Sequence, residues 1–234
     1  MPRFRFYGEG IPGVDLNSLT GRLIVLEGPD SVGRSTQIEM LKDWLESKGH
    51  AVSYTGLSRS ELTHEGLDQA KRGHTLGRKT MSLFYCTDFA DRLENQIIPA
   101  LRAGYYVLSD RYFYSIGARD IVRGADQEWL EDVYGFALVP DLTLYLKVEV
   151  EDLVPRALYG KGFNYWESGM DLGLGDNLHD SFMIYQSRLI AELDKMSQRY
   201  GFTTIDATRS PEAIFEDLKQ AILPVMGRNA EALP

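Results

Sequence analysis

One short stretch of the chain, from Leu23 to Gln37, constrains its fold more than any other. It reads "LIVLEGPDSVGRSTQ". The apolar run that ends in glycine is typical of a central β-strand, and the apolar spacing after Thr36 is typical of a helix, closed here by Gly49. Between them the residues almost match G-x-x-x-x-G-K-S/T, a loop whose backbone N–H groups point inward at a phosphate. The stretch therefore predicts a phosphate-binding loop between a buried strand and a helix.

The loop departs from that pattern at one position, because Arg34 stands where lysine is expected. Gly28 and Gly33 allow the backbone path, and the positive end of the following helix adds to the attraction for phosphate. Neither feature needs the lysine, so we expect phosphate binding to survive. Arginine can neutralise charge and bridge two oxygens, although it is planar and bulkier than lysine. Ser35 is placed to hold Mg²⁺, and Thr36 lies next to the phosphates.

Strand-like and helix-like segments alternate along the chain. Strands are predicted at "RLIVLEG", "HAVSYTG", "YYVLSDR", "PDLTLYLKV" and "GFTTIDA". Helices are predicted at 36–49, 60–73, 77–104, 126–138, 149–159, 178–200 and 210–222. Pro99 is expected to kink the longest of these or divide it in two. The alternation predicts an α/β fold with a five-stranded parallel sheet and helices on both faces.

The chain is expected to form one domain over residues 21–226 rather than two. Residues 1–20 contain the stretch "YGEGIPG" and show no clear period, so an irregular N-terminal arm is predicted there. Residues 227–234 are expected to form a tail. The segment at about 160–178 is rich in glycine and aromatic residues and is a candidate for a mobile lid.

Composition argues against several classes of function. The chain has 234 residues, 44% of them hydrophobic, and a net charge of −9, which disfavours a general nucleic-acid-binding surface. No stretch approaches the ~20 apolar residues of a membrane span. A single cysteine, Cys86, permits no intrachain disulfide and favours a reducing compartment. With no apolar run of a signal peptide at the start, these features predict a cytoplasmic protein without membrane or nucleic-acid partners.

The polar residues of interest fall at the carboxyl ends of the predicted strands. Those ends carry the glycine loop, "TGLSR", "SDRYFYS" and "IDATR". In an open parallel sheet, ligands bind beyond these ends. Bringing two phosphate groups together requires several cations and a metal ion. Arg34, Arg59, Arg111 and a cation of the lid could supply them.

Three stretches occur in the order and spacing found in the thymidylate kinases. They are "LEGPDSVGRSTQ", "LSDRYFYSIGA" and "PDLTLYL", and the resemblance runs from Arg22 to Ile222. The acidic residue inside the loop and the Asp-Arg-Tyr end of the third strand make the resemblance specific. It implies a P-loop NTPase fold and a nucleoside monophosphate kinase that transfers the γ-phosphate of ATP to dTMP with Mg²⁺. It also implies small-molecule nucleotides as ligands and a homodimer.

The resemblance also implies roles for individual residues. Arg34, Asp110 and Arg111 would be catalytic, and Ser35 and Asp110 would hold the Mg²⁺ ion. ATP would be bound by Gly28, Ser31, Val32, Gly33, Arg34, Ser35, Thr36, Arg156, Lys161, Ala207 and Arg209. For the acceptor, the resemblance implies Asp30, Arg59, Arg111 and Ser115. From residue chemistry we add Tyr85 and Phe89, which could stack on a planar base, and Arg92 and Arg119.

The departures from the family pattern cluster around the acceptor base. Phe89 stands where the family has a base-reading arginine, and Arg92 lies one turn further on nearly the same helix face. The family's Tyr-Gln pair beside the base is replaced by Arg119 and Asp120. The lid sequence "NYWE" contains no arginine, which leaves Arg156 and Lys161 as its candidate cations.

Two other functions stay open at this point. Arg34 and the arginine-poor lid are compatible with a non-catalytic nucleotide binder, a sensor or scaffold descended from a kinase. Alternatively, the protein is a kinase of another phosphorylated metabolite, whose additional anionic groups would be bound by Arg119 and Arg123.

Overall fold

The computed structural model describes residues 2–160 and 162–226. Lys161 and the predicted tail at 227–234 lie outside the described residues, so the predictions made for them stay predictions. Within the described ranges, no helix is both long enough and apolar enough to cross a membrane.

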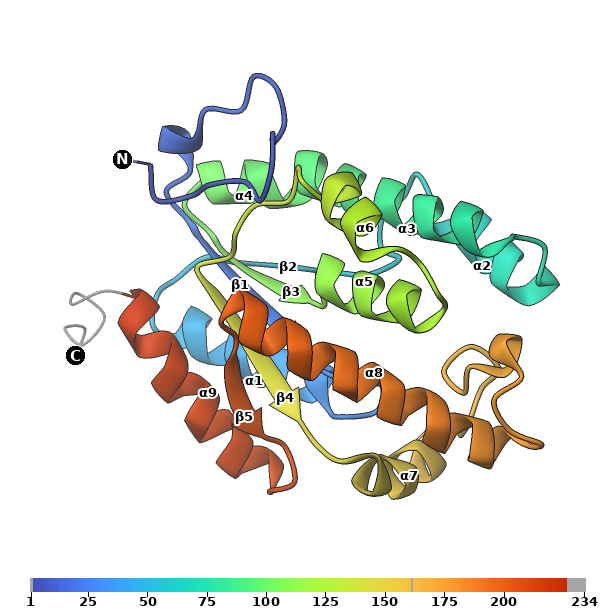
Figure 1. Cartoon of the computed structure of the whole chain (residues 1–234). Helices are drawn as coiled ribbons and strands as arrows, with labels where there is room; N and C mark the ends of the chain where they lie inside the picture. Colours follow the sequence, from blue (N-terminus) through green and yellow to red (C-terminus); the bar gives the residue numbers. More distant parts are fainter. Residues whose placement is uncertain (1, 161, 227–234) are drawn as a thin grey trace.

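A parallel β-sheet of five strands forms the centre of the fold (Figure 1). The strands follow the order β2-β3-β1-β4-β5, and every neighbouring pair is parallel. Their bounds are β1 Arg22–Glu27, β2 Val52–Gly56, β3 Tyr106–Asp110, β4 Leu142–Lys147 and β5 Thr203–Asp206. The loop after β1 therefore opens near the middle of the sheet, where the strand order reverses and open α/β sheets bind their ligands.

Helices cover both faces of the sheet (Figure 1). Alternate residues of β1 point to opposite faces, so that Ile24 and Leu26 belong to one core cluster and Leu23 and Val25 to another. The first cluster includes residues of α1 (Arg34–Ser47), α7 (Val150–Tyr159) and α9 (Pro211–Met226). The second cluster includes residues of α3 (Arg78–Arg92), α4 (Ile98–Arg102), α5 (Phe113–Val122) and α6 (Gln127–Val133). Helix α2 (His64–Gly73) packs on α3, and α8 (Leu178–Tyr200) packs on α5 and α7. The predicted fold class is confirmed.

Two of the predicted helices are modified in the structure. The long segment is divided by a π-helical turn, Leu93–Ile97, which separates α3 from α4. Pro99 lies in the first turn of α4, directly after this π-helical turn. The helix predicted at 126–138 ends earlier, at Val133, and residues beyond it pair with the N-terminal arm.

Helix α5 was missed by the sequence patterns, and its first turn is capped from another element. The carboxylate of Glu27, at the end of β1, accepts hydrogen bonds from the backbone N–H groups of Tyr112 at 2.8 Å and Ser115 at 3.3 Å. It also accepts one from the Ser115 hydroxyl. Burial raises the pKa of Glu27. Because the cap comes from β1, no local sequence signal marks the start of α5.

Replacing Glu27 with alanine is expected to lower the free energy of unfolding by about 2 kcal/mol, since buried donors at the start of α5 lose their acceptor. Glu27→Gln keeps one acceptor oxygen and should lose less. Urea unfolding measures both variants against Glu61→Ala, which changes an exposed glutamate. An equal loss for Glu27→Ala and Glu61→Ala would show that the cap contributes nothing.

Candidate active site

The loop between β1 and α1 has the backbone shape of a phosphate-binding loop. Three of its residues have positive φ: Gly28 at 153°, Ser31 at 63° and Gly33 at 102°. A Cβ atom on Gly28 would come within 2.9 Å of the Leu146 carbonyl oxygen, so only glycine fits there. Val32 is 2% exposed and anchors the loop in the core. The loop thus leads directly into the first turn of α1, whose N–H groups have no partners within the helix.

The side chain of Arg34 folds back over this loop. Its Nη1 donates to the carbonyl oxygens of Gly28 at 2.8 Å and Pro29 at 2.5 Å, and its Nε donates to Asp110 at 2.7 Å. Burial acts to raise the pKa of Asp110, but the charges of Arg34 and Arg111 outweigh it and lower that pKa below its usual value. The structure therefore brings Arg34 and an ionised Asp110 together, across the gap between the loop and β3.

A second acid, Asp30, joins two further arginines at the rim of the loop. Arg111 Nη2 donates to Asp30 at 2.5 Å, and Arg119 Nη2 donates to both carboxylate oxygens at 2.9 Å. Arg111 also donates to Ser115 Oγ at 3.0 Å, and Gln186 Nε2 donates to Asp30 at 3.2 Å. All of these partners lie close together, so a single buried carboxylate fixes the directions of two guanidinium groups.

The charges of this cluster shift each other's pKa values. Burial alone would raise the pKa of Asp30, but Arg119, Arg111 and Arg34 together hold it well below its usual range. Burial and the neighbouring charges of Arg119 and Arg34 lower the pKa of Arg111 to about 10. Asp30, Arg111 and Arg119 therefore all stay charged at neutral pH.

A cleft of about 340 Å³ opens beside this cluster. Of the residues predicted to bind the acceptor, Asp30, Tyr85, Arg111 and Arg119 line it. Arg123, to which the alternative of another phosphorylated metabolite gave an acceptor role, lines it too. Sequence reasoning gave no acceptor role to the other lining residues, which are Leu57, Ser58, Lys71, Met81, Ile116, Asp120, Asn164, Trp166 and Glu167. The volume lies in the range of small-molecule sites, and its lining combines aromatic, apolar and charged groups.

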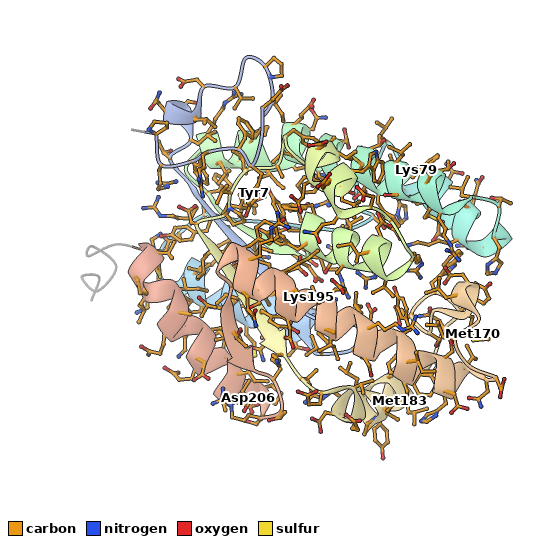
Figure 2. All side chains as sticks on the ribbon, viewed as in Figure 1. Tyr7, Lys79, Met170, Met183, Lys195 and Asp206 are labelled. Atoms are coloured by element: carbon orange, nitrogen blue, oxygen red, sulfur yellow. The ribbon has the colours of Figure 1, made fainter. Side chains whose placement is uncertain are left out.

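The predicted lid closes one side of the cleft. We call residues 162–177 the lid segment; Met170, marked in Figure 2, lies in it. Arg123 of α5 donates to both carboxylate oxygens of Asp171, at 2.9 and 3.1 Å, and to the Tyr185 hydroxyl at 2.5 Å. The Trp166 indole donates to the Lys71 carbonyl of α2 at 3.1 Å. These contacts hold the lid segment against both α5 and α2.

Two of the residues predicted to bind the acceptor lie away from the cleft. Phe89 and Arg92 are both fully buried and do not line the cleft. The Phe89 ring packs edge-on against Tyr112, with ring centroids 4.7 Å apart. Arg92 Nε donates to Asp88, and that buried carboxylate accepts the backbone N–H groups of Ser58 and Ser60. This pair therefore holds the loop after β2 in place.

The remaining predicted residues lie either on the donor side, which is the side of the glycine loop where ATP is predicted to bind, or at the protein surface. Arg156 donates to the carbonyl oxygens of Val32 at 3.2 Å and Ala207 at 2.7 Å, so it joins the loop after β1 to the loop after β5. Arg209 is exposed and pairs with Asp206 and Asp217. Arg59 is exposed, does not line the cleft and lies over the Tyr54 ring at 4.3 Å. Ser35 and Thr36 are exposed in the first turn of α1.

The parallel sheet, the glycine loop, the strand-end acid and the arginine-lined cleft define a P-loop phosphotransferase. A sequence model of the thymidylate kinase family matches residues 26–218. The chain belongs to the thymidylate kinase family, whose members are nucleoside monophosphate kinases that use ATP as phosphoryl donor with Mg²⁺.

Individual relatives match over most of the chain. A probable thymidylate kinase 2 from Saccharolobus solfataricus is 37% identical over 207 residues, covering 87% of this chain and 96% of that protein. A thymidylate kinase from Synechococcus is 30% identical over 217 residues, covering 87% of this chain and 96% of that protein. A probable thymidylate kinase from Thermococcus kodakarensis is 36% identical over 142 residues, 57% of this chain and 69% of its own length.

Replacing Asp88 with alanine is expected to destabilise the fold by about 3–5 kcal/mol, because Arg92 is then left buried and unpaired. The matched control is Asp68→Ala, which breaks the exposed Arg72–Asp68 pair on α2 and should cost no more than about 0.5 kcal/mol. Urea unfolding compares the two. Similar losses in both variants would contradict a structural role for the buried pair.

Proposed function

We propose that this protein transfers the γ-phosphate of ATP to dTMP, forming dTDP and ADP. The observation that carries the proposal is the placement of three guanidinium groups, those of Arg34, Arg111 and Arg119, around the glycine loop and the adjacent cleft. Family membership and the names of the relatives support dTMP as the acceptor.

Phosphoryl transfer depends on positioning and on stabilising charge rather than on covalent chemistry by the protein. The loop amides and Arg34 are placed to hold the donor phosphates, with Arg156 securing the loop on the donor side. Arg111 lies between the loop and the cleft, where it can direct the acceptor phosphate toward the donor. Asp30 holds Arg111 and Arg119 in place before any ligand arrives, so little reorganisation is needed during the reaction.

Ser35 and Asp110 fit the Mg²⁺ ion that the family implies. A hydroxyl and a carboxylate are oxygen ligands, and Mg²⁺ typically takes one or two from the protein and the rest from phosphates and water. Asp110 Oδ1 accepts from Arg34, whereas Oδ2 accepts no hydrogen bond from any residue that the structure describes. When bound, the metal would supply positive charge that neutralises the phosphates.

The cleft gives little support to an acceptor with additional anionic groups. Arg119 already donates from Nη2 to both oxygens of Asp30, and Arg123 forms a bidentate pair with Asp171 through Nε and Nη2. Both arginines thus have internal partners, and they hold the shape of the cleft and of the lid segment.

We propose that the lid, at about 160–178, belongs to a single kinase domain over residues 21–226.

The first experiment measures ADP release with ATP, Mg²⁺ and a panel of nucleoside monophosphates. We expect turnover with dTMP in the wild type. Arg34→Ala should lower kcat by about 10²–10³-fold, because it removes a charge aimed at the transferring group, whereas Arg34→Lys should retain activity. Absence of turnover with every acceptor, in the wild type and in Arg34→Lys alike, would contradict the proposal and favour a non-catalytic nucleotide binder.

We further propose that the protein acts as a homodimer in the cytoplasm, with nucleotides as its ligands and no nucleic-acid partner. The resemblance to thymidylate kinases and the net charge of −9 support this. Light scattering after size exclusion should give twice the 26.5 kDa mass of one chain. A monomer mass at micromolar concentration would contradict the dimer, and tight binding to duplex DNA at physiological salt would contradict the choice of ligands.

A further inference from the structure

The N-terminal arm, residues 2–20, precedes the part of the chain that matches the family, which begins at residue 26. It is largely irregular, with a short 3₁₀ turn at Leu16–Ser18. It is nevertheless attached to the domain (Figure 1), because Phe4 is only 2% exposed and Leu19 only 4%. Both residues belong to the core cluster that includes α3 and α5. The arm thus packs into the hydrophobic core as part of the folded domain.

The arm pairs with the segment between α6 and β4. Val139 N–H donates to the Arg5 carbonyl at 2.8 Å, and Tyr7 N–H donates to the Ala137 carbonyl at 3.0 Å. Phe6 and Leu138 form an antiparallel bridge between these two bonds. The arm therefore acts as an additional strand-like partner that fixes residues 137–139.

That segment and the arm both contact the first turn of α5. The Leu138 carbonyl accepts a hydrogen bond from the Tyr112 hydroxyl at 2.9 Å. The Tyr7 hydroxyl lies 2.5 Å from the Tyr114 hydroxyl, and its ring meets Phe113 edge-on at 5.3 Å. Figure 2 marks Tyr7 where the arm meets the rest of the domain. The arm thus contacts Phe113 and Tyr114 of α5 directly, and it supports Tyr112, the N-cap residue, through Leu138.

These residues immediately follow Arg111, whose backbone needs support. Arg111 has φ of 72°, in the left-handed region that residues other than glycine seldom adopt. Such a conformation persists only where the surrounding structure fixes it. Glu27 fixes the turn from β1, through Tyr112 N–H and Ser115. The arm also contacts the Tyr114 side chain directly, and it supports the Tyr112 side chain through Leu138, which pairs with Phe6.

We propose that the arm is a positioning element for the acceptor site. By bracing the first turn of α5, it holds Arg111 at the cleft, together with the buried Ser115 whose hydroxyl accepts a hydrogen bond from Arg111. The inference rests on the proposed function, in which Arg111 directs the acceptor phosphate. The contacts of Arg156 with Val32 and Ala207, on the ATP side of the site, involve no arm residue. Loss of the arm should therefore weaken binding of the acceptor more than binding of ATP.

The test compares two arm variants with a control in the same segment. The variants are Tyr7→Phe, which removes one hydroxyl, and a deletion of residues 2–10. The control is Glu9→Ala, since Glu9 is exposed and makes no side-chain hydrogen bond to a described residue. Steady-state kinetics give kcat and the KM values for dTMP and for ATP, and thermal unfolding gives Tm. All kinetics are run well below the lowest Tm.

For Tyr7→Phe we expect the KM for dTMP to rise about threefold, the effect of one net hydrogen bond. For the deletion we expect kcat/KM for dTMP to fall by at least about tenfold, because displaced catalytic groups lose rate steeply. The KM for ATP should stay within about twofold in both, and Glu9→Ala should match the wild type. If the deletion variant does not fold, Tyr7→Phe decides the matter alone.

Two results would overturn the inference. The first is a lower Tm in the arm variants with wild-type kcat and KM for dTMP, which would make the arm a stabilising element only. The second is an equal rise in the KM values for dTMP and ATP, which would indicate a general loss of structure. If the wild type fails to turn over dTMP, the proposed function fails and the arm's role in acceptor binding falls with it.

Discussion

The contact between Arg34 and Asp110 is the interaction on which the rest of the site depends. It joins the glycine loop to the end of β3 by a hydrogen bond of 2.7 Å between groups with little solvent exposure. The same guanidinium donates to two carbonyl oxygens of the loop. Arg34 thus satisfies acceptors of its own loop. In the proposed function, a bound triphosphate would replace these neutral acceptors with charged phosphate oxygens, which form stronger hydrogen bonds.

Asp30 is the centre of a second group of buried, paired charges. Burying arginines is costly unless each finds a partner, and one carboxylate serves both Arg111 and Arg119. Gln186 links that carboxylate to the lid segment, because its amide donates to Asp30 and to the Glu167 carbonyl at 2.8 Å. The charged groups to which the proposed function gives roles in phosphoryl transfer are therefore held by the protein itself, and the lid segment is connected to them.

Sequence patterns predicted the parts of the fold and site that depend on neighbours along the chain. The strand, loop and helix around Gly28 and Arg34 are local, and so is the pair Asp110 and Arg111 at a strand end. What was missed depends on distant contacts. Helix α5 takes its cap from Glu27 of β1, and the cleft residues Lys71 and Trp166 meet only when the lid segment reaches α2. Phe89 and Arg92 share a helix face, but only the packing of α3 reveals that this face is buried.

The most direct test is a crystal structure of the protein with a non-hydrolysable ATP analogue, Mg²⁺ and dTMP. We expect the triphosphate in the glycine loop, with the Arg34 guanidinium released from the Gly28 and Pro29 carbonyls and bound to phosphate oxygens. We also expect the dTMP phosphate to contact Arg111 at the rim of the cleft. A nucleotide bound elsewhere, or an Arg34 side chain turned to solvent beside an empty loop, would contradict the central claim.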